Sequence, residues 1–112
     1  MRYFVNEIER RESQSTCFFE FQKGDCEDAF WLDDSVSIGD TLWDELNFTD
    51  LFKSLCPDFD YYGRTVVTHT QWREIKNLAE ENGGAQYEAV KELSMWADEC
   101  FLSNDVFTIC GL

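Results

Sequence analysis

Residues 64–84 read RTVVTHTQWREIKNLAEENGG and carry the clearest signals of local structure in the chain. Thr68 precedes Gln71 by three residues, which is the spacing of a capping box at the start of a helix. Val67 and Trp72 occupy the two positions of the hydrophobic staple that often accompanies such a box. The stretch therefore predicts a short β-strand followed at once by a capped helix.

This helix is expected to begin at His69 and to stop at residues 82–84, because the Asn-Gly-Gly run favours the left-handed conformation that ends helices. A second helix is predicted from about Ala85 to Leu102, where apolar residues recur at the spacing of one buried face. Those residues are Ala89, Val90, Leu93, Trp96, Ala97, Cys100 and Phe101. Residues 106–110 (VFTIC) alternate and predict a closing strand.

The N-terminal part of the chain alternates between apolar and polar residues. Residues 2–9 (RYFVNEIE) and 16–22 (TCFFEFQ) both have a period of two, and the polar residues 10–15 separate them. This pattern predicts an N-terminal antiparallel hairpin.

The middle of the chain is less regular. Residues 29–32 (AFWL) are expected to form a third strand, with residues 36–38 as a short extension. Asp40 is a plausible N-cap for one broken helix or two short helices between residues 41 and 55, and Pro57 ends this helical region.

These segments predict a single domain over residues 1–112. The expected fold class is α+β, with a small, mostly antiparallel sheet made from the N-terminal hairpin and the C-terminal strand, and with helices packed on one face. The hydrophobic content of 44% is enough for a packed core at this length.

The chain is strongly acidic, with a formal net charge of −14. Residues 24–60 hold eleven of the acidic residues and a single basic residue, Lys53. Such a surface repels nucleic acid and anionic membranes and attracts basic proteins, although it can also serve solubility alone. The aromatic residues interleaved with these acids favour a partner-binding surface, so we expect a basic protein partner and neither nucleic acid nor membrane.

The candidate partner-binding residues are the acids of this segment and two of its tryptophans. They are Trp31, Asp33, Asp34, Asp40, Trp43, Asp44, Glu45, Asp50, Asp58 and Asp60. Each tryptophan could be either a core residue or an aromatic anchor at an interface, the kind of residue that carries much of the binding energy.

Sites for metals, cofactors and catalysis are not expected. An EF-hand loop starting at Asp34 would need oxygen ligands where Val36 and Ile38 stand. His69 is the single histidine and has no cysteine at ligand spacing. The carboxylates show no spacing that implies a paired general acid and base, so the protein is not expected to be an enzyme.

The cysteines and the N-terminus indicate a cytoplasmic protein. The five cysteines, which are irregularly spaced, are Cys17, Cys26, Cys56, Cys100 and Cys110. An odd number with no C-x-x-C pair favours reduced thiols in a cytosol. Residues 1–20 lack the layout of a signal peptide, and no apolar run reaches the length of a membrane span. A monomer is favoured.

Residues 64–112 resemble the ends of many small immunity proteins of bacterial polymorphic toxin and contact-dependent growth inhibition systems. The resemblance lies in the succession of RTVVTHTQW, REIKNLAEENGG, ELSMWADECF and FTICGL, a strand, a helix, a tryptophan-bearing helix and a final strand. It implies a cytosolic inhibitor that binds and blocks a toxin made beside it. Such proteins are often acidic because many of the toxins are basic nucleases.

Three functions are compatible with these features. The first is an immunity protein that neutralises a cognate basic toxin domain, expected to be a nuclease, through its acidic, aromatic-bearing surface. The second is a nucleic-acid mimic that inhibits a DNA-binding or nucleic-acid-guided defence enzyme and carries carboxylates along one elongated face. The third is a small acidic enzyme or ligand-binding domain, which would need a deep pocket.

Overall fold

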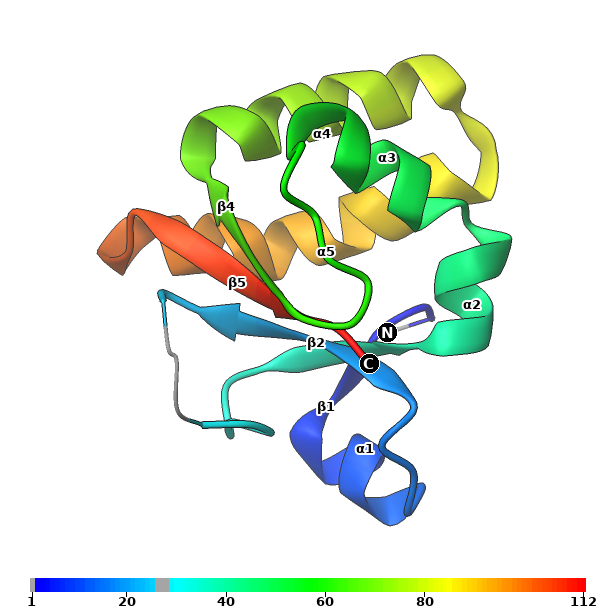
Figure 1. Cartoon of the computed structure of the whole chain (residues 1–112), viewed down its shortest axis with the longest axis vertical. Coiled ribbons are helices and arrows are strands. Elements are labelled where there is room, and N and C mark those ends of the chain that lie inside the picture. The colour runs from blue at the N-terminus through cyan, green and yellow to red at the C-terminus, as the bar shows by residue number, and fades with distance from the viewer. Residues whose placement is uncertain (1, 26–28) are drawn as a thin grey trace.

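A five-stranded sheet lies at the centre of the fold (Figure 1), and each pair of neighbouring strands is antiparallel. The computed structural model describes residues 2–25 and 29–112. The strands are β1 (Val5–Asn6), β2 (Phe18–Lys23), β3 (Val36–Gly39), β4 (Arg64–Thr68) and β5 (Val106–Cys110). The helices are α1 (Glu7–Glu12), α2 (Asp40–Glu45), α3 (Phe48–Leu55), α4 (His69–Asn82) and α5 (Gly84–Ser103). The predicted α+β fold class is confirmed.

The strand order is β1-β3-β2-β5-β4, so β2 is central and β1 and β4 are the edges. The C-terminal strand β5 returns to pair with β2, as expected. The predicted N-terminal hairpin is wrong in its pairing, because β1 pairs with β3 and not with β2.

Residues 2–9 form a two-residue strand and the start of a helix instead of the single strand predicted. Asn6 and Glu9 make a capping box, with each side chain accepting a hydrogen bond from the backbone N–H of the other residue. The buried Glu7 then pairs with Arg10 one turn later, at 2.7 Å between Oε2 and Nη2. This local polar bonding outweighs the alternating pattern, because it satisfies the N–H groups at the start of the helix.

The predicted start of the fourth helix is confirmed. Thr68 is its N-cap, and the reciprocal hydrogen bonds with Gln71 measure 3.1 and 2.9 Å. Trp72, in the first turn of this helix, is fully buried and packs edge-on against Phe107 of β5. In Figure 1, α4 and α5 lie together above the sheet and α1 lies below it.

The middle of the chain forms two short helices, which is one of the two arrangements that the sequence left open. Asn47 adopts a left-handed conformation (φ 56°) between α2 and α3. The N-cap of α2 is Gly39, whereas Asp40, the predicted cap, is the first helical residue. Residues 29–32 do not form the strand predicted, and β3 begins only at Val36.

The two faces of the sheet differ in chemistry. The upper face, which α4 and α5 cover, carries apolar side chains such as Phe19, Phe21, Phe107 and Ile109. On the lower face the alternate positions hold buried polar side chains, among them Glu20, Gln22, Ser37 and Thr108. Apolar and polar side chains therefore alternate along β2 and β5, as the sequence predicts. The buried polar side chains of the lower face must be shielded from solvent by another segment of the chain.

Candidate functional site

Glu20 organises the chain that covers the lower face. Its carboxylate accepts hydrogen bonds from the backbone N–H groups of Trp31 (2.9 Å) and Leu32 (2.8 Å) and from the hydroxyl of Ser35 (2.6 Å). The Gln22 amide adds a fourth bond at 3.0 Å. The buried charge is thus fully engaged in holding the segment before β3, including the left-handed backbone of Trp31 (φ 60°).

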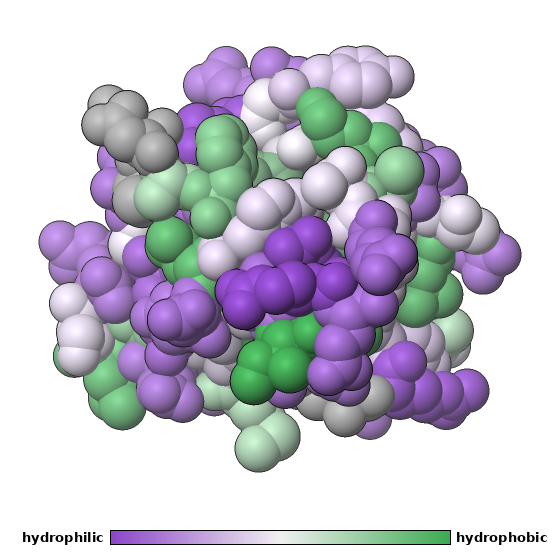
Figure 2. Space-filling view, turned by 90° about the horizontal axis from the view of Figure 1, so that it is seen from below, coloured by the Kyte–Doolittle hydropathy of each residue, from purple (hydrophilic) through white to green (hydrophobic). Residues whose placement is uncertain are grey.

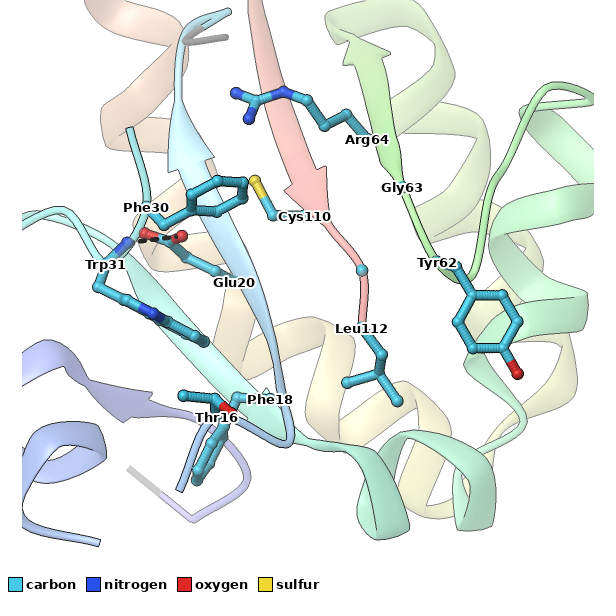
Figure 3. A pocket seen from close by; sticks show the side chains of 11 residues that line it. Thr16, Phe18, Glu20, Phe30, Trp31, Tyr62, Gly63, Arg64, Cys110 and Leu112 are labelled. Atoms are coloured by element: carbon cyan, nitrogen blue, oxygen red, sulfur yellow. Dashed lines mark hydrogen bonds between the residues drawn. The ribbon is translucent and has the colours of Figure 1, made fainter. Parts of the chain in front are cut away.

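This segment and the start of β2 on one side, and the end of β5 with the start of β4 and the loop before it on the other, line an open cavity of about 340 Å³ (Figure 3). Its walls come mainly from five large side chains that we call the aromatic groove. They are Phe18, Phe30, Trp31, Tyr62 and Leu112. Tyr62 and Phe30 are 76% and 59% exposed, so the groove presents apolar surface to solvent. Figure 2 shows this lower side of the molecule, where apolar areas lie between hydrophilic side chains.

Gly111 allows the end of β5 to approach the loop before β4. Its N–H donates to the Gly63 carbonyl at 2.7 Å, and Leu112 N–H donates to the Tyr61 carbonyl at 2.9 Å. A Cβ atom at position 111 would collide with the same Tyr61 carbonyl. These contacts hold Leu112 against the loop that carries Tyr62.

Two arginines of the protein already lie over aromatic rings of the groove. The Arg10 guanidinium carbon is 4.0 Å from the centre of the Trp31 ring, and that of Arg64 is 5.6 Å from the centre of the Phe30 ring. Arg10 is fixed in place by its pair of bonds to Glu7. One face of each of these rings is therefore covered by a cation from the chain itself.

Three carboxylates lie at the end of the sheet where β2 begins and β3 ends, and we call them the acidic rim. They are Asp40, Asp44 and Asp60. The Tyr61 hydroxyl donates to Asp44 at 3.2 Å, and the Tyr62 N–H donates to Asp60 at 2.9 Å. Desolvation, then the hydrogen bond to Asp44 and the negative charges of Asp44 and Asp40, raises the pKa of Tyr61 above its ordinary value. The rim thus adjoins the groove at Tyr62.

The structure separates the other predicted residues. Asp33 and Asp34 are exposed before β3, whereas Asp40 follows it, and six residues of extended chain span roughly 20 Å. Asp50 and Asp58 are exposed on α3 and on the loop after it, and Glu45 is exposed on α2. The ten predicted residues therefore do not form one patch.

Trp43 is a core residue and not an interface anchor. It is 0% exposed and stacks on Phe19, with ring centres 3.9 Å apart. Its indole N–H donates to Thr49 at 2.8 Å, so its polar atom is satisfied internally. Trp31 is half-buried and lines the groove, so it remains a candidate.

Five residues of this site were not among the candidates chosen from the sequence, namely Phe18, Phe30, Tyr61, Tyr62 and Leu112. The run DFDYYG at residues 58–63 is predicted to be a loop. Its two tyrosines lie beside two acids, and this feature of the sequence could have indicated a binding site. Their contacts join segments far apart in sequence, such as Tyr61 with Asp44, which spacing does not reveal.

The acids of residues 24–60 that the structure describes form no ion pair with another described residue. The described residues form four ion pairs in all, and the acidic members of these pairs are Glu7, Glu88 and Glu99. The described part of the chain holds no group of three potential metal ligands. None of its helices has the length and apolar character needed to cross a membrane.

The chain matches no protein-family model, no curated protein and no solved structure.

Proposed function

We propose that this protein is an immunity protein, which binds and neutralises a cognate basic toxin domain. The observation that carries the proposal is the acidic rim beside the aromatic groove. Carboxylates that form no ion pair with another described residue lie next to exposed aromatic side chains, and these two chemistries complement a basic protein surface.

The net charge of −14 supports fast association with such a partner. Unpaired surface charge of one sign lowers folding stability through self-repulsion, and it raises the on-rate for an oppositely charged protein. Exposed aromatic side chains then slow dissociation, because aromatic residues are enriched among those that dominate interface energies. A basic nuclease is a suitable partner, because carboxylates of this protein can occupy the positions where the phosphates of the nuclease's substrate bind.

The state of the thiols supports action in the cytoplasm of the producing cell. Cys17, which is exposed, and the buried Cys56 and Cys100 are free. Burial raises the pKa of Cys56 to about 11, which keeps this thiol protonated and unreactive near neutral pH. Reduced, buried thiols that fill core space are usual for proteins in reducing compartments.

The nucleic-acid-mimic alternative has less support. It needs carboxylates along one elongated face, whereas the acids described above lie at both ends of β3 and on α3. The enzyme alternative needs a free carboxylate in a pocket, whereas both oxygens of Glu20 already accept hydrogen bonds.

Co-expression with the product of the adjoining gene tests the proposal. In the native host this gene should encode a secreted protein with a basic C-terminal domain. That domain is expected to arrest growth when produced alone in the cytoplasm, and growth should recover when the present protein is made with it. A domain that remains toxic in the presence of this protein, or a neighbouring gene that encodes no toxin, would contradict the proposal.

A further inference from the structure

We propose that the aromatic groove receives an apolar side chain of the partner, flanked on one side by lysine or arginine residues that contact the acidic rim. This inference rests on the proposed function and specifies the chemistry of the segment that docks. It predicts that the centre of the contact is apolar and that the partner's cations lie at its edge near Tyr62.

The groove has the character of an interface and not of a core region left open by chance. Phe30, Tyr62 and Leu112 are exposed, and all three line the same cavity. Clustered aromatic side chains around one concavity are rare on monomer surfaces without a binding role. A volume of about 340 Å³ accommodates one or two apolar side chains.

The centre of the groove is unsuited to a cation. Arg64 lines the groove and lies over Phe30, so a partner lysine or arginine placed there would meet its positive charge, whereas Arg10, over Trp31, is already paired with Glu7. The one carboxylate in the wall, Glu20, has its oxygens engaged with Trp31, Leu32 and Ser35. An uncharged apolar group meets neither problem and gains from burial against the rings.

The end of the groove near Tyr62 has the opposite polarity. Asp40, Asp44 and Asp60 carry negative charge there and have no basic partner among the described residues. Asp44 also accepts a hydrogen bond from Tyr61, which fixes one carboxylate beside the opening. Charge complementarity therefore places the partner's basic residues at this end and fixes the direction of the docked segment.

Affinity measurements with the purified toxin domain encoded by the adjoining gene test the inference. The first variant, Phe30→Ala with Tyr62→Ala, removes two exposed groove side chains. Its matched control, Met95→Ala with Leu102→Ala, removes two side chains on α5 that are 81% and 85% exposed. The groove variant is expected to bind at least about 30-fold more weakly, and the control within about 3-fold of wild type.

A third variant, Arg64→Gln, reports the charge of the group in the centre. If the partner's side chain in the centre of the groove is apolar, the affinity of Arg64→Gln should lie within about 3-fold of the wild-type affinity. An increase of tenfold or more would show a cation in the groove, and a decrease of the same size would show a carboxylate, and either result overturns the inference. Thermal unfolding of each variant checks that the fold is retained.

The outcomes separate this inference from the proposed function. If the wild-type protein binds the toxin domain and the groove variant binds equally well, the groove assignment is overturned and the proposed function stands. If the wild-type protein does not bind the toxin domain, the proposed function fails and the groove assignment fails with it.

Discussion

At the scale of single residues, buried carboxylates determine how the lower face of the sheet is covered. Glu20 lies in the middle of β2, where a charged residue is costly unless its oxygens are fully hydrogen-bonded. It meets that condition by accepting backbone N–H groups from the segment that holds Trp31. Glu7 meets it through Arg10, which in turn lies over the Trp31 ring. Both carboxylates therefore help to hold Trp31 in place, Glu20 through its backbone and Glu7 through Arg10.

Replacing Glu20 should loosen this segment. In Glu20→Gln the amide retains one acceptor oxygen and loses the charge, so at least one N–H group of residues 31 and 32 is left with a weaker bond. The free energy of unfolding is expected to fall by about 1–3 kcal/mol in urea denaturation. Glu12→Gln changes the same group on an exposed helical position and should leave stability nearly unaltered. Equal effects of the two substitutions would contradict the role given to Glu20.

Glu7 predicts a pH dependence of stability. The hydrogen bond from Arg10, together with the charges of Arg10 and Arg11, lowers the pKa of Glu7 below its ordinary value. A carboxyl whose pKa is lower in the folded state stabilises the fold above its unfolded pKa, and this contribution disappears as the pH falls through the folded pKa. The stability difference between wild type and Glu7→Gln should therefore be largest near pH 7 and should shrink below about pH 4. Urea denaturation across this range measures it, and a difference independent of pH would rule out the pairing.

At the scale of elements, signals that lie within a few residues were readable from the sequence, and pairings across the chain were not. The box formed by Thr68 and Gln71 needs only four residues, and α4 begins where it predicts. The box of Asn6 and Glu9 was equally local, but an alternating pattern in residues 2–9 obscured it. The pairing of β1 with β3, and the contact of Tyr61 with Asp44, depend on how the whole sheet closes. For the same reason the acidic character of the surface was predictable, whereas the groove was not.

The cap of α4 provides the test at this scale. Thr68→Ala removes the oxygen that accepts the Gln71 N–H, and the free energy of unfolding should fall by about 1 kcal/mol. Thr70→Ala, two residues later and exposed, removes the same hydroxyl without a capping role. Thermal or urea unfolding of the two variants should separate them, and an unchanged stability of Thr68→Ala would show that the capping bond contributes nothing.

At the scale of the whole molecule, the fold assigns stability and recognition to different parts. The upper face of the sheet, with α4 and α5, holds most of the apolar core. The lower face and the adjoining end of the sheet hold the exposed aromatic side chains of the groove and the carboxylates of the acidic rim. Because these groups contribute little to the core, they can be changed with small effects on folding, and binding can be measured separately from stability.

The most direct test of the central claim is the affinity of the toxin domain for charge-reversed proteins, measured by isothermal titration calorimetry at moderate salt. Asp44→Lys with Glu45→Lys reverses one acid of the rim and its exposed neighbour on α2, and Glu80→Lys with Glu81→Lys reverses two exposed acids on α4. Both variants change the net charge equally, so a difference between them reports position and not total charge. The account predicts that the rim variant loses at least about tenfold in affinity relative to the α4 variant. Equal affinities for the two variants, or wild-type affinity for the rim variant, would contradict it.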